Sequence, residues 1–110
     1  MTRPPSIGDL RERVTLQQRI YASDGGGGVT ESWSAIIALW AAVRTLGGEE
    51  RLAADAISGR LTHEVWLHYR AGVTPAMRFE WRGRPLEIRA VFDPDGRQRR
   101  LKCLCAERDL

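Results

Sequence analysis

The sequence predicts a mainly β protein: a small β-barrel or β-sandwich of about six to seven strands, with one short helix or loop insertion at about residues 47–59. Three observations lead to this fold class. Short segments of alternating apolar and polar residues recur from Arg13 to Glu107, turn residues separate them, and only one alanine-rich segment has helical spacing. With 110 residues, 43% of them hydrophobic, the chain has the length and composition of one globular domain.

The N-terminal segment, residues 1–12, is predicted to be a flexible tail that precedes a single barrel domain at 13–107. Pro4 and Pro5 exclude a helix at the start of this tail. The residues that follow them are sufficient for one helical turn at most. No signal peptide and no membrane-spanning segment is expected.

Seven segments have the alternation that is typical of strands: 13–21, 29–34, 36–46, 61–70, 77–82, 86–92 and 97–107. The glycine-rich loop at 23–28 and the tight turn at 82–85 are the clearest hairpin connections. The third segment is apolar on both faces, so Trp40 is expected in the core. Residues 49–57 have helical spacing, and their leading glutamates favour a helix N-terminus.

One face of each strand is expected to line the core. The inward sets are Val14, Leu16 and Ile20 in the first strand, Met77, Phe79 and Trp81 in the fifth, and Leu86, Ile88, Ala90 and Phe92 in the sixth. Cys103 and Cys105 share a face of the last strand, with Cα atoms roughly 6.5–7 Å apart. That separation is at or beyond the limit for a disulfide, so both are interpreted as reduced, core-facing thiols of a reducing cytosol.

The net charge is +3, and sixteen of the seventeen basic residues are arginines. They are spread along the chain among acidic residues, so the charge by itself does not indicate nucleic-acid binding. Arg97, Arg99 and Arg100 cluster beside Lys102 at the start of the last strand, either as solvated edge charges or as a contact to an acidic neighbour or DNA. Trp66 lies on an otherwise polar strand face and is the best candidate for an interface anchor.

No catalytic site, metal site or cofactor is predicted. His63 and His68 are five residues apart on a strand, so they point to opposite faces and cannot chelate one metal ion without a bulge. The four glycines at 25–28 are not followed by the Lys-Ser/Thr of a phosphate-binding loop. Since no nucleophile with a base and no paired-carboxylate motif is present, the sequence predicts a protein that is not an enzyme.

Several segments, taken together in their order and spacing, carry a resemblance to one protein family. These segments are Gly8–Gln18, Glu31–Trp33, Leu39–Arg44, Gly48–Glu50, Thr62–Val65, Tyr69–Arg78, Leu86–Val91, Asp93–Arg97 and Leu101–Cys105. Over roughly residues 8–107 the chain resembles the head–tail joining (head-closure, or stopper) proteins of tailed siphophages and related gene transfer agents. The arginine-rich composition suits a GC-rich bacterium and leaves phage, prophage and gene transfer agent open.

The resemblance implies a small β-barrel, without catalytic residues or cofactors, that assembles into a ring of six or twelve copies. Such a ring lies below the portal and adaptor proteins, closes the DNA exit of a filled head, and meets the tail terminator or tail tube protein on its other side. DNA passes through the ring without sequence-specific binding, and no membrane partner is implied. The expected location is the neck of a virion or virus-like particle, after assembly in the bacterial cytoplasm.

In this family the segment between the third and fourth strands can project toward the central channel. The resemblance therefore implies Glu49, Glu50, Arg51 and Asp55 as candidate channel or gate residues, in either a plug or a clamp on the adaptor. The alternative function is a nucleic-acid-binding barrel of the OB or SH3-like type. It is suggested by basic and aromatic residues that alternate over 77–82, as a base-stacking platform requires.

Overall fold

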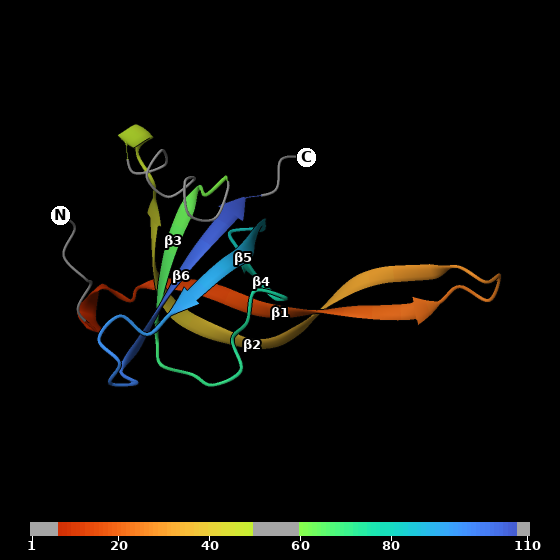
Figure 1. The fold of residues 1–110 in the computed structure, drawn as a ribbon, viewed down its shortest axis with the longest axis horizontal. Coiled ribbons are helices and arrows are strands. Elements are labelled where there is room, and N and C mark those ends of the chain that lie inside the picture. The colour runs from red at the N-terminus through yellow and green to blue at the C-terminus, as the bar shows by residue number, and fades with distance from the viewer. Residues whose placement is uncertain (1–6, 50–59, 108–110) are drawn as a thin grey trace.

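The structure, a computed structural model, describes residues 7–49 and 60–107. Six strands form one antiparallel sheet that closes into a barrel in the order β1-β2-β3-β6-β5-β4 (Figure 1). The strands are β1 Glu12–Ser23, β2 Val29–Thr45, β3 His63–His68, β4 Arg78–Trp81, β5 Arg84–Phe92 and β6 Arg100–Glu107, and a 3-10 turn at Ile7–Asp9 precedes them. The predicted fold class, mainly β and barrel-like, is confirmed.

The core occupies the interior of the barrel and takes side chains from all six strands. The residues that are at most 2% exposed there are Val14, Leu16, Ala41, Val65, Leu67, Phe79, Leu86, Ile88, Cys103 and Cys105. Both cysteines are free thiols that face this core, as predicted. Burial raises the pKa of Cys103 to about 12 and places that of Cys105 well above its usual range. No helix among the described residues is long and apolar enough to cross a membrane.

A single 17-residue strand, β2, takes the place of the two strands expected at 29–34 and 36–46. The prediction of two strands was wrong because of a bulge. Leu16 of β1 pairs with Ile37, and the next residue of β1 pairs with Ala35, so Ile36 is an extra residue in β2. A bulge bends a strand and shifts the phase of its alternation without ending it, and in the sequence such a shift resembles a break.

Beyond this bulge, β1 and β2 leave the barrel together as a long two-stranded arm, residues 18–35 (Figure 1). Pairing of β1 with β4 stops at Gln17, and pairing of β2 with β3 begins only at Ala41. The molecule is therefore elongated, at 52 × 28 × 26 Å, and its radius of gyration is 14.9 Å. A compact domain of about 100 residues has a radius of gyration of about 13 Å, so the arm accounts for the excess.

A second bulge, in β5, changes which residues face the core. Arg89 is unpaired between Ile88 and Ala90 in the register with β6. As a result Val91 packs against the core, whereas Ala90 joins a small cluster outside it and Phe92 is 45% exposed. The prediction that Ala90 and Phe92 face inward was wrong, because strict alternation does not allow for an inserted residue. Ile20, also expected inward, lies on the arm and is 41% exposed.

Candidate assembly surfaces

The arm presents one charged and aromatic face. On this face Arg19 forms an ion pair with Glu31 (3.2 Å) and donates a hydrogen bond to the hydroxyl of Tyr21 (3.2 Å). The Arg19 guanidinium also lies over the ring of Trp33, 4.9 Å from its centroid, and Arg78 of β4 lies 4.3 Å from the same centroid. These contacts hold Trp33 between two cations where the arm leaves the barrel.

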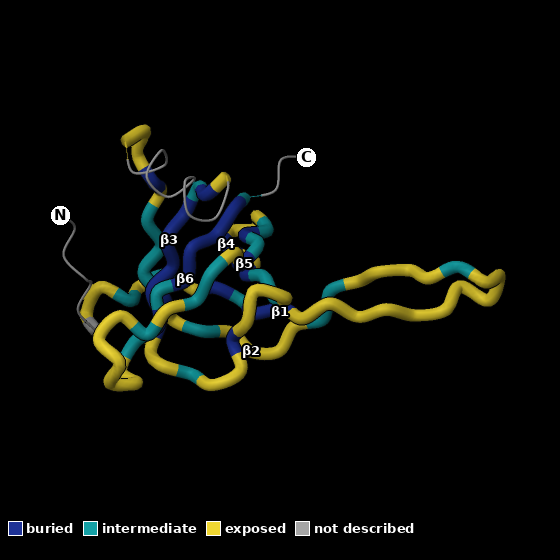
Figure 2. The backbone as a smooth tube through the Cα atoms, viewed as in Figure 1, coloured by how far each residue is buried: buried dark blue, intermediate teal, exposed yellow. Residues whose placement is uncertain are grey.

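The opposite face of the arm is uncharged. Cross-strand pairing places together on it Gln18 with Ser34, Ile20 with Ser32, and Ala22 with Thr30. Figure 2 shows that nearly the whole arm is exposed. Tyr21 and Val29, which lie on the charged face near the tip, are 60% and 68% exposed.

The loop at the tip of the arm has a defined local structure. Asp24 accepts hydrogen bonds through Oδ1 from the backbone N–H groups of Gly26 (2.8 Å) and Gly28 (3.0 Å). Gly25 and Gly27 have φ values of +83° and +87°, which glycine adopts without steric cost. An aspartate followed by glycines is the sequence signal for such a turn, so the sequence expectation of a merely flexible loop underestimated its organisation.

Both edges of the arm lack a neighbouring strand within the part of the chain that the structure describes. The free edge of β1 runs over 18–23 and that of β2 over 29–40. Unpaired edges are usually protected by lysine, proline, a bulge or an inward-pointing charge. These two edges contain neither lysine nor proline; the bulge at Ile36 and the charged residues Arg19 and Glu31 are the protective features present.

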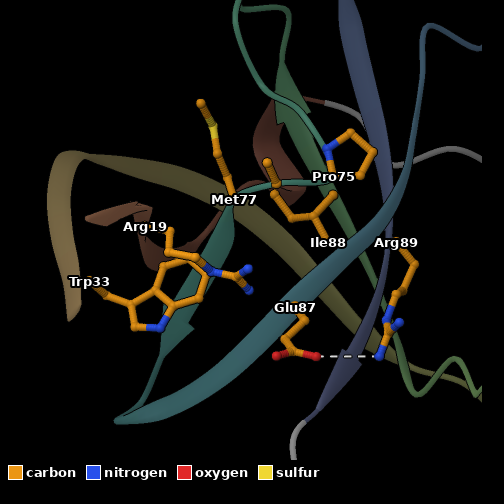
Figure 3. Close-up of a pocket in the computed structure, with 8 residues that line it drawn as sticks. Arg19, Trp33, Pro75, Met77, Glu87, Ile88 and Arg89 are labelled. Atoms are coloured by element: carbon orange, nitrogen blue, oxygen red, sulfur yellow. Dashed lines mark hydrogen bonds and ion pairs between the residues drawn. The ribbon is translucent and has the colours of Figure 1, made fainter. Parts of the chain in front are cut away.

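A cavity of about 290 Å³ lies at the root of the arm (Figure 3). Trp33, Met77 and Ile88 line it together with residues of the loop before β4. Glu87 and Arg89 of β5 also line the cavity and form an ion pair with each other (3.3 Å). The cavity is therefore a partly apolar hollow with charged groups around it.

Trp66, the predicted interface anchor, lies on the same face of β3 as the charged Glu64, as predicted, but it is only 7% exposed. The cationic groups of Arg100 and Lys102 lie 5.8 and 5.6 Å from its ring centroid. Because β3 has a strand on each side, long side chains from β6 cover its outer face. The interface role of Trp66 stays a prediction.

A buried carboxylate, Glu64, organises the same outer face. Glu64 is 5% exposed, and its carboxylate accepts a hydrogen bond from the Trp66 indole N–H (2.5 Å). It also forms ion pairs with Arg44 (2.9 Å) and Lys102 (3.6 Å). Since a buried charge is tolerated only when it is paired, this network fixes the position of Trp66. Alternation in the sequence predicted only that Glu64 lies on the face opposite the core.

The predicted basic cluster is divided between a loop and a strand. Because β6 begins at Arg100, Arg97 and Arg99 lie in the preceding loop, where both are exposed. Arg99 forms an ion pair with Asp95 (2.7 Å), whose carboxylate also accepts the Arg97 backbone N–H (3.0 Å). These two contacts lower the pKa of Asp95 to about 2. The interface role of these three arginines stays a prediction.

Of the four predicted gate residues, Glu49 alone lies within the described residues, where it is exposed. Glu50, Arg51 and Asp55, and with them the rest of the predicted helix at 49–57, lie outside the described residues. The gate assignment therefore stays a prediction.

The two ends of the insertion are held side by side on the outer face of the barrel. Leu46 and Leu61 are 6% and 0% exposed and pack with Leu104 and the half-buried Ala90. The Leu46 N–H donates a hydrogen bond to the carbonyl of Thr62 (2.9 Å). Contacts with the barrel therefore fix both ends of the insertion.

Trp40, expected in the core, is 54% exposed, so that prediction was wrong. At this position β2 has not yet joined β3, and the Arg13 guanidinium lies 4.6 Å from the Trp40 ring centroid. Trp40, Leu10, Arg11 and His68 line an open hollow of about 360 Å³ near the N-terminal end of β1. Sequence alternation did not reveal this exposed patch, because an apolar run on both faces is more often buried.

The remaining polar groups of the described residues do not form a metal centre. Among residues 7–49 and 60–107, no group of three or more His, Cys, Asp or Glu side chains could hold a metal ion. His63 is 2% exposed, with Nδ1 2.8 Å from the Thr62 hydroxyl, and its ring meets that of Trp81 edge-on at 5.5 Å. The unbroken register of β3 with β6 places His68 on the face opposite His63, as predicted, and His68 is exposed.

The base-stacking platform of the alternative function is absent from β4. Phe79 and Trp81, the aromatic residues expected to stack on bases, are 0% and 8% exposed and point into the core. Nucleic-acid-binding barrels need such rings on an accessible surface. The two rings on which this alternative depended are therefore not accessible for base stacking in β4.

Comparison with known proteins agrees with the resemblance in the sequence. The family model described as phage head completion protein matches residues 5–108. The solution structure of protein SF1141 from Shigella flexneri 2a is similar to this chain, with 30% identity, a TM-score of 0.75 and coverage of 94% of this chain and 96% of that one. A chain in the virion of a native gene transfer agent particle has 21% identity, a TM-score of 0.60 and coverage of 89% and 94%, and supports the fold. None of the curated proteins matches.

The family match spans nearly the whole barrel and the arm, so it is not restricted to one motif. The chain therefore belongs to the phage head completion protein family, and it is a structural component of a phage-type head and tail assembly.

Proposed function

We propose that this chain is the stopper subunit of a head–tail neck. In this role, copies of it form a ring below the portal and adaptor proteins that closes the DNA exit of a filled head and docks the tail. The observation that carries the proposal is the family match over residues 5–108. The likeness to a chain of a gene transfer agent virion supports the same location, the neck of a virion or virus-like particle.

The architecture suits a ring subunit. A closed barrel with a filled interior is a rigid block, and its neighbours in the ring meet it through heterologous, head-to-tail contacts that close by rotation. The arm, the hollow beside Trp40 and the arginine loop at 97–99 offer distinct surfaces for such contacts. We assign three kinds of partner to these surfaces. They are the neighbouring copies in a ring of six or twelve, the adaptor protein on the head side, and the tail terminator or tail tube protein on the other side.

The insertion at 47–59 is the proposed gate. Its ends are fixed on the barrel by Leu46 and Leu61, and Glu49 at its start is exposed. A channel that passes DNA must not hold phosphate, and phosphate affinity rises with each lysine or arginine in contact. Glu50 and Asp55 would keep the duplex from adhering, and DNA would pass without sequence-specific binding.

The role requires no catalysis. Assembly in the bacterial cytoplasm, followed by residence in the particle, needs only stable surfaces that recognise one another. The two natural thiols are buried, and the pKa of each is raised by that burial, so neither is a nucleophile at neutral pH. We therefore propose a non-enzymatic connector.

The test is deletion of the gene in the particle-producing host, followed by complementation. Without the protein we expect heads that package DNA but lose it or fail to join tails, and a cryo-microscopy map of complemented necks should contain a ring of this chain. Normal tailed, infectious or transducing particles without the gene would refute the proposal.

The gate has a test of its own. Replacement of residues 51–56 by a glycine bridge should leave the barrel folded, while the resulting particles fill but fail to hold DNA or to join tails. Particles of normal stability and infectivity would refute the gate assignment while leaving the connector role in place.

A further inference from the structure

We propose that the arms of neighbouring copies pair with one another, edge to edge. In this arrangement the β2 edge of one arm, residues 29–40, adds to the β1 edge of the next, residues 18–23, and the copies share one continuous antiparallel sheet. The inference rests on the proposed ring and names the surface that builds it.

The first support is the hydrogen-bonding capacity that the arm leaves open. Backbone N–H and C=O groups along an unpaired edge are available to another strand, and strand addition to such an edge is a common mode of recognition. The two free edges lie on opposite sides of the same arm. One copy can therefore receive a strand on one side and offer a strand on the other, as a ring requires.

The second support is the instability of an isolated arm. A single two-stranded hairpin is marginally stable at best in water, and three or more strands are needed for independent stability. This hairpin also exposes Ile20, Tyr21 and Val29 at 41%, 60% and 68%. Pairing with a second arm would supply the missing strands and cover part of this apolar surface.

The third support is the distribution of charge along the two edges. Arg19, the only charged residue of the β1 edge, and Glu31, the only one of the β2 edge, lie on the same face of the arm. Head-to-tail pairing brings the Glu31 edge of one copy beside the Arg19 edge of the next, where opposite charges attract. Two-fold pairing of like edges would bring Glu31 toward Glu31 or Arg19 toward Arg19. The charges therefore favour the contact that closes a ring over the one that ends in a dimer.

The fourth support is the cavity at the root of the arm. The strand β4 begins at Arg78, beside Gln17, and the β1 edge is open beyond that point. A strand added to this edge continues the line of β4 and passes over the cavity lined by Met77 and Ile88 (Figure 3). The incoming arm would thus fill a hollow that the isolated chain leaves open to solvent.

Mixed single-cysteine variants test the pairing. Ile20→Cys places a thiol near the β1 edge, Ser32→Cys places one near the β2 edge, and the natural thiols are buried and unreactive. Necks are isolated from particles whose host supplies both variants, and are treated with a short bifunctional thiol reagent. Ala71→Cys, on an exposed turn outside the arm, replaces either variant as the matched control. Each variant is also tested alone for incorporation into necks and for tail joining.

We expect a cross-linked dimer in necks that contain Ile20→Cys and Ser32→Cys together, and none in necks with either variant alone or with the control. A dimer from one variant alone would overturn the proposal in favour of two-fold pairing. Incorporation of both variants without a mixed dimer would overturn the arm contact while leaving the ring intact. Absence of the wild-type chain from the neck would overturn both the arm contact and the proposed function.

Discussion

The barrel and the arm are built from the same two strands, yet they depend on different partners for their order. In the barrel every strand has two neighbouring strands, and the side chains that face the interior are buried around Phe79. In the arm β1 and β2 have only each other, and nearly every residue is exposed (Figure 2). The boundary between barrel and arm lies at the Ile36 bulge, where the pairing of β1 with β4 ends.

This difference indicates how one small chain can be both stable and dependent on assembly. The barrel obtains its stability from apolar side chains removed from water within one copy. The arm lacks such a core, and an isolated two-stranded hairpin is marginally stable, so we expect contacts with another molecule to add to its order. A substitution in the barrel should therefore change folding, whereas a change in the arm should alter assembly.

The largest effect on folding is expected for Phe79→Ala. Phe79 is 0% exposed in the barrel interior, so truncation leaves a cavity and should lower the free energy of unfolding by about 3–5 kcal/mol. Urea denaturation followed by tryptophan fluorescence measures the change. A loss no larger than that of an exposed residue would contradict the assignment of the core.

The next effect is a loss of stability at alkaline pH. The folded-state pKa of Cys103 is about 12 and that of Cys105 is also raised, whereas an unfolded cysteine ionises near pH 8.5. Unfolding above that pH releases protons, so stability is fully present below about pH 8.5 and falls as the pH rises toward 12. The slope should be about 1.4 kcal/mol per pH unit for each thiol.

Urea denaturation at pH 8 and pH 10 measures this slope. A variant with both Cys103→Ala and Cys105→Ala should lose most of this pH dependence of stability, because it has no buried thiol. An equal slope in the wild type and the double variant would show that the two thiols do not cause it.

A smaller effect is expected for Trp40→Ala. Although the sequence places Trp40 in the core, its side chain is 54% exposed and in contact with the Arg13 guanidinium. Its removal should lower the free energy of unfolding by about 1 kcal/mol, because an exposed cation–π contact and a small buried area are lost. Thermal unfolding of Trp40→Ala and Phe79→Ala, measured side by side, compares the loss of an exposed ring with the loss of a buried one. A cost as large as that of the core variant would mean that Trp40 is buried in solution.

The smallest effect on folding, with the largest effect on assembly, is expected when the arm is shortened. Deletion of residues 20–32, with Arg19 joined to Trp33 through Asn-Gly, should change the free energy of unfolding by about 1 kcal/mol or less, since the hairpin is marginal alone. Tail joining should fail in complemented particles. If the shortened variant unfolds, the barrel is not stable independently of the arm. If it joins tails normally, the arm is not needed for assembly.

Much of the fold could be predicted because alternation and turn residues act locally. Phe79, Trp81 and Cys103 were placed inward from spacing alone, and the hairpin turn after β4 follows from Arg82 and Gly83, whose φ values are +53° and +76°. These inferences need only neighbours in the sequence.

The amino-acid sequence by itself determined the strands, the core-facing alternation and membership of the head completion family. Only the tertiary structure decided that β2 continues through Ile36, that Trp66 is covered while Trp40 is exposed, and that two strands extend beyond the barrel as an arm. The physical reason is that burial and edge pairing depend on which strands lie alongside, and these partners come from distant parts of the chain.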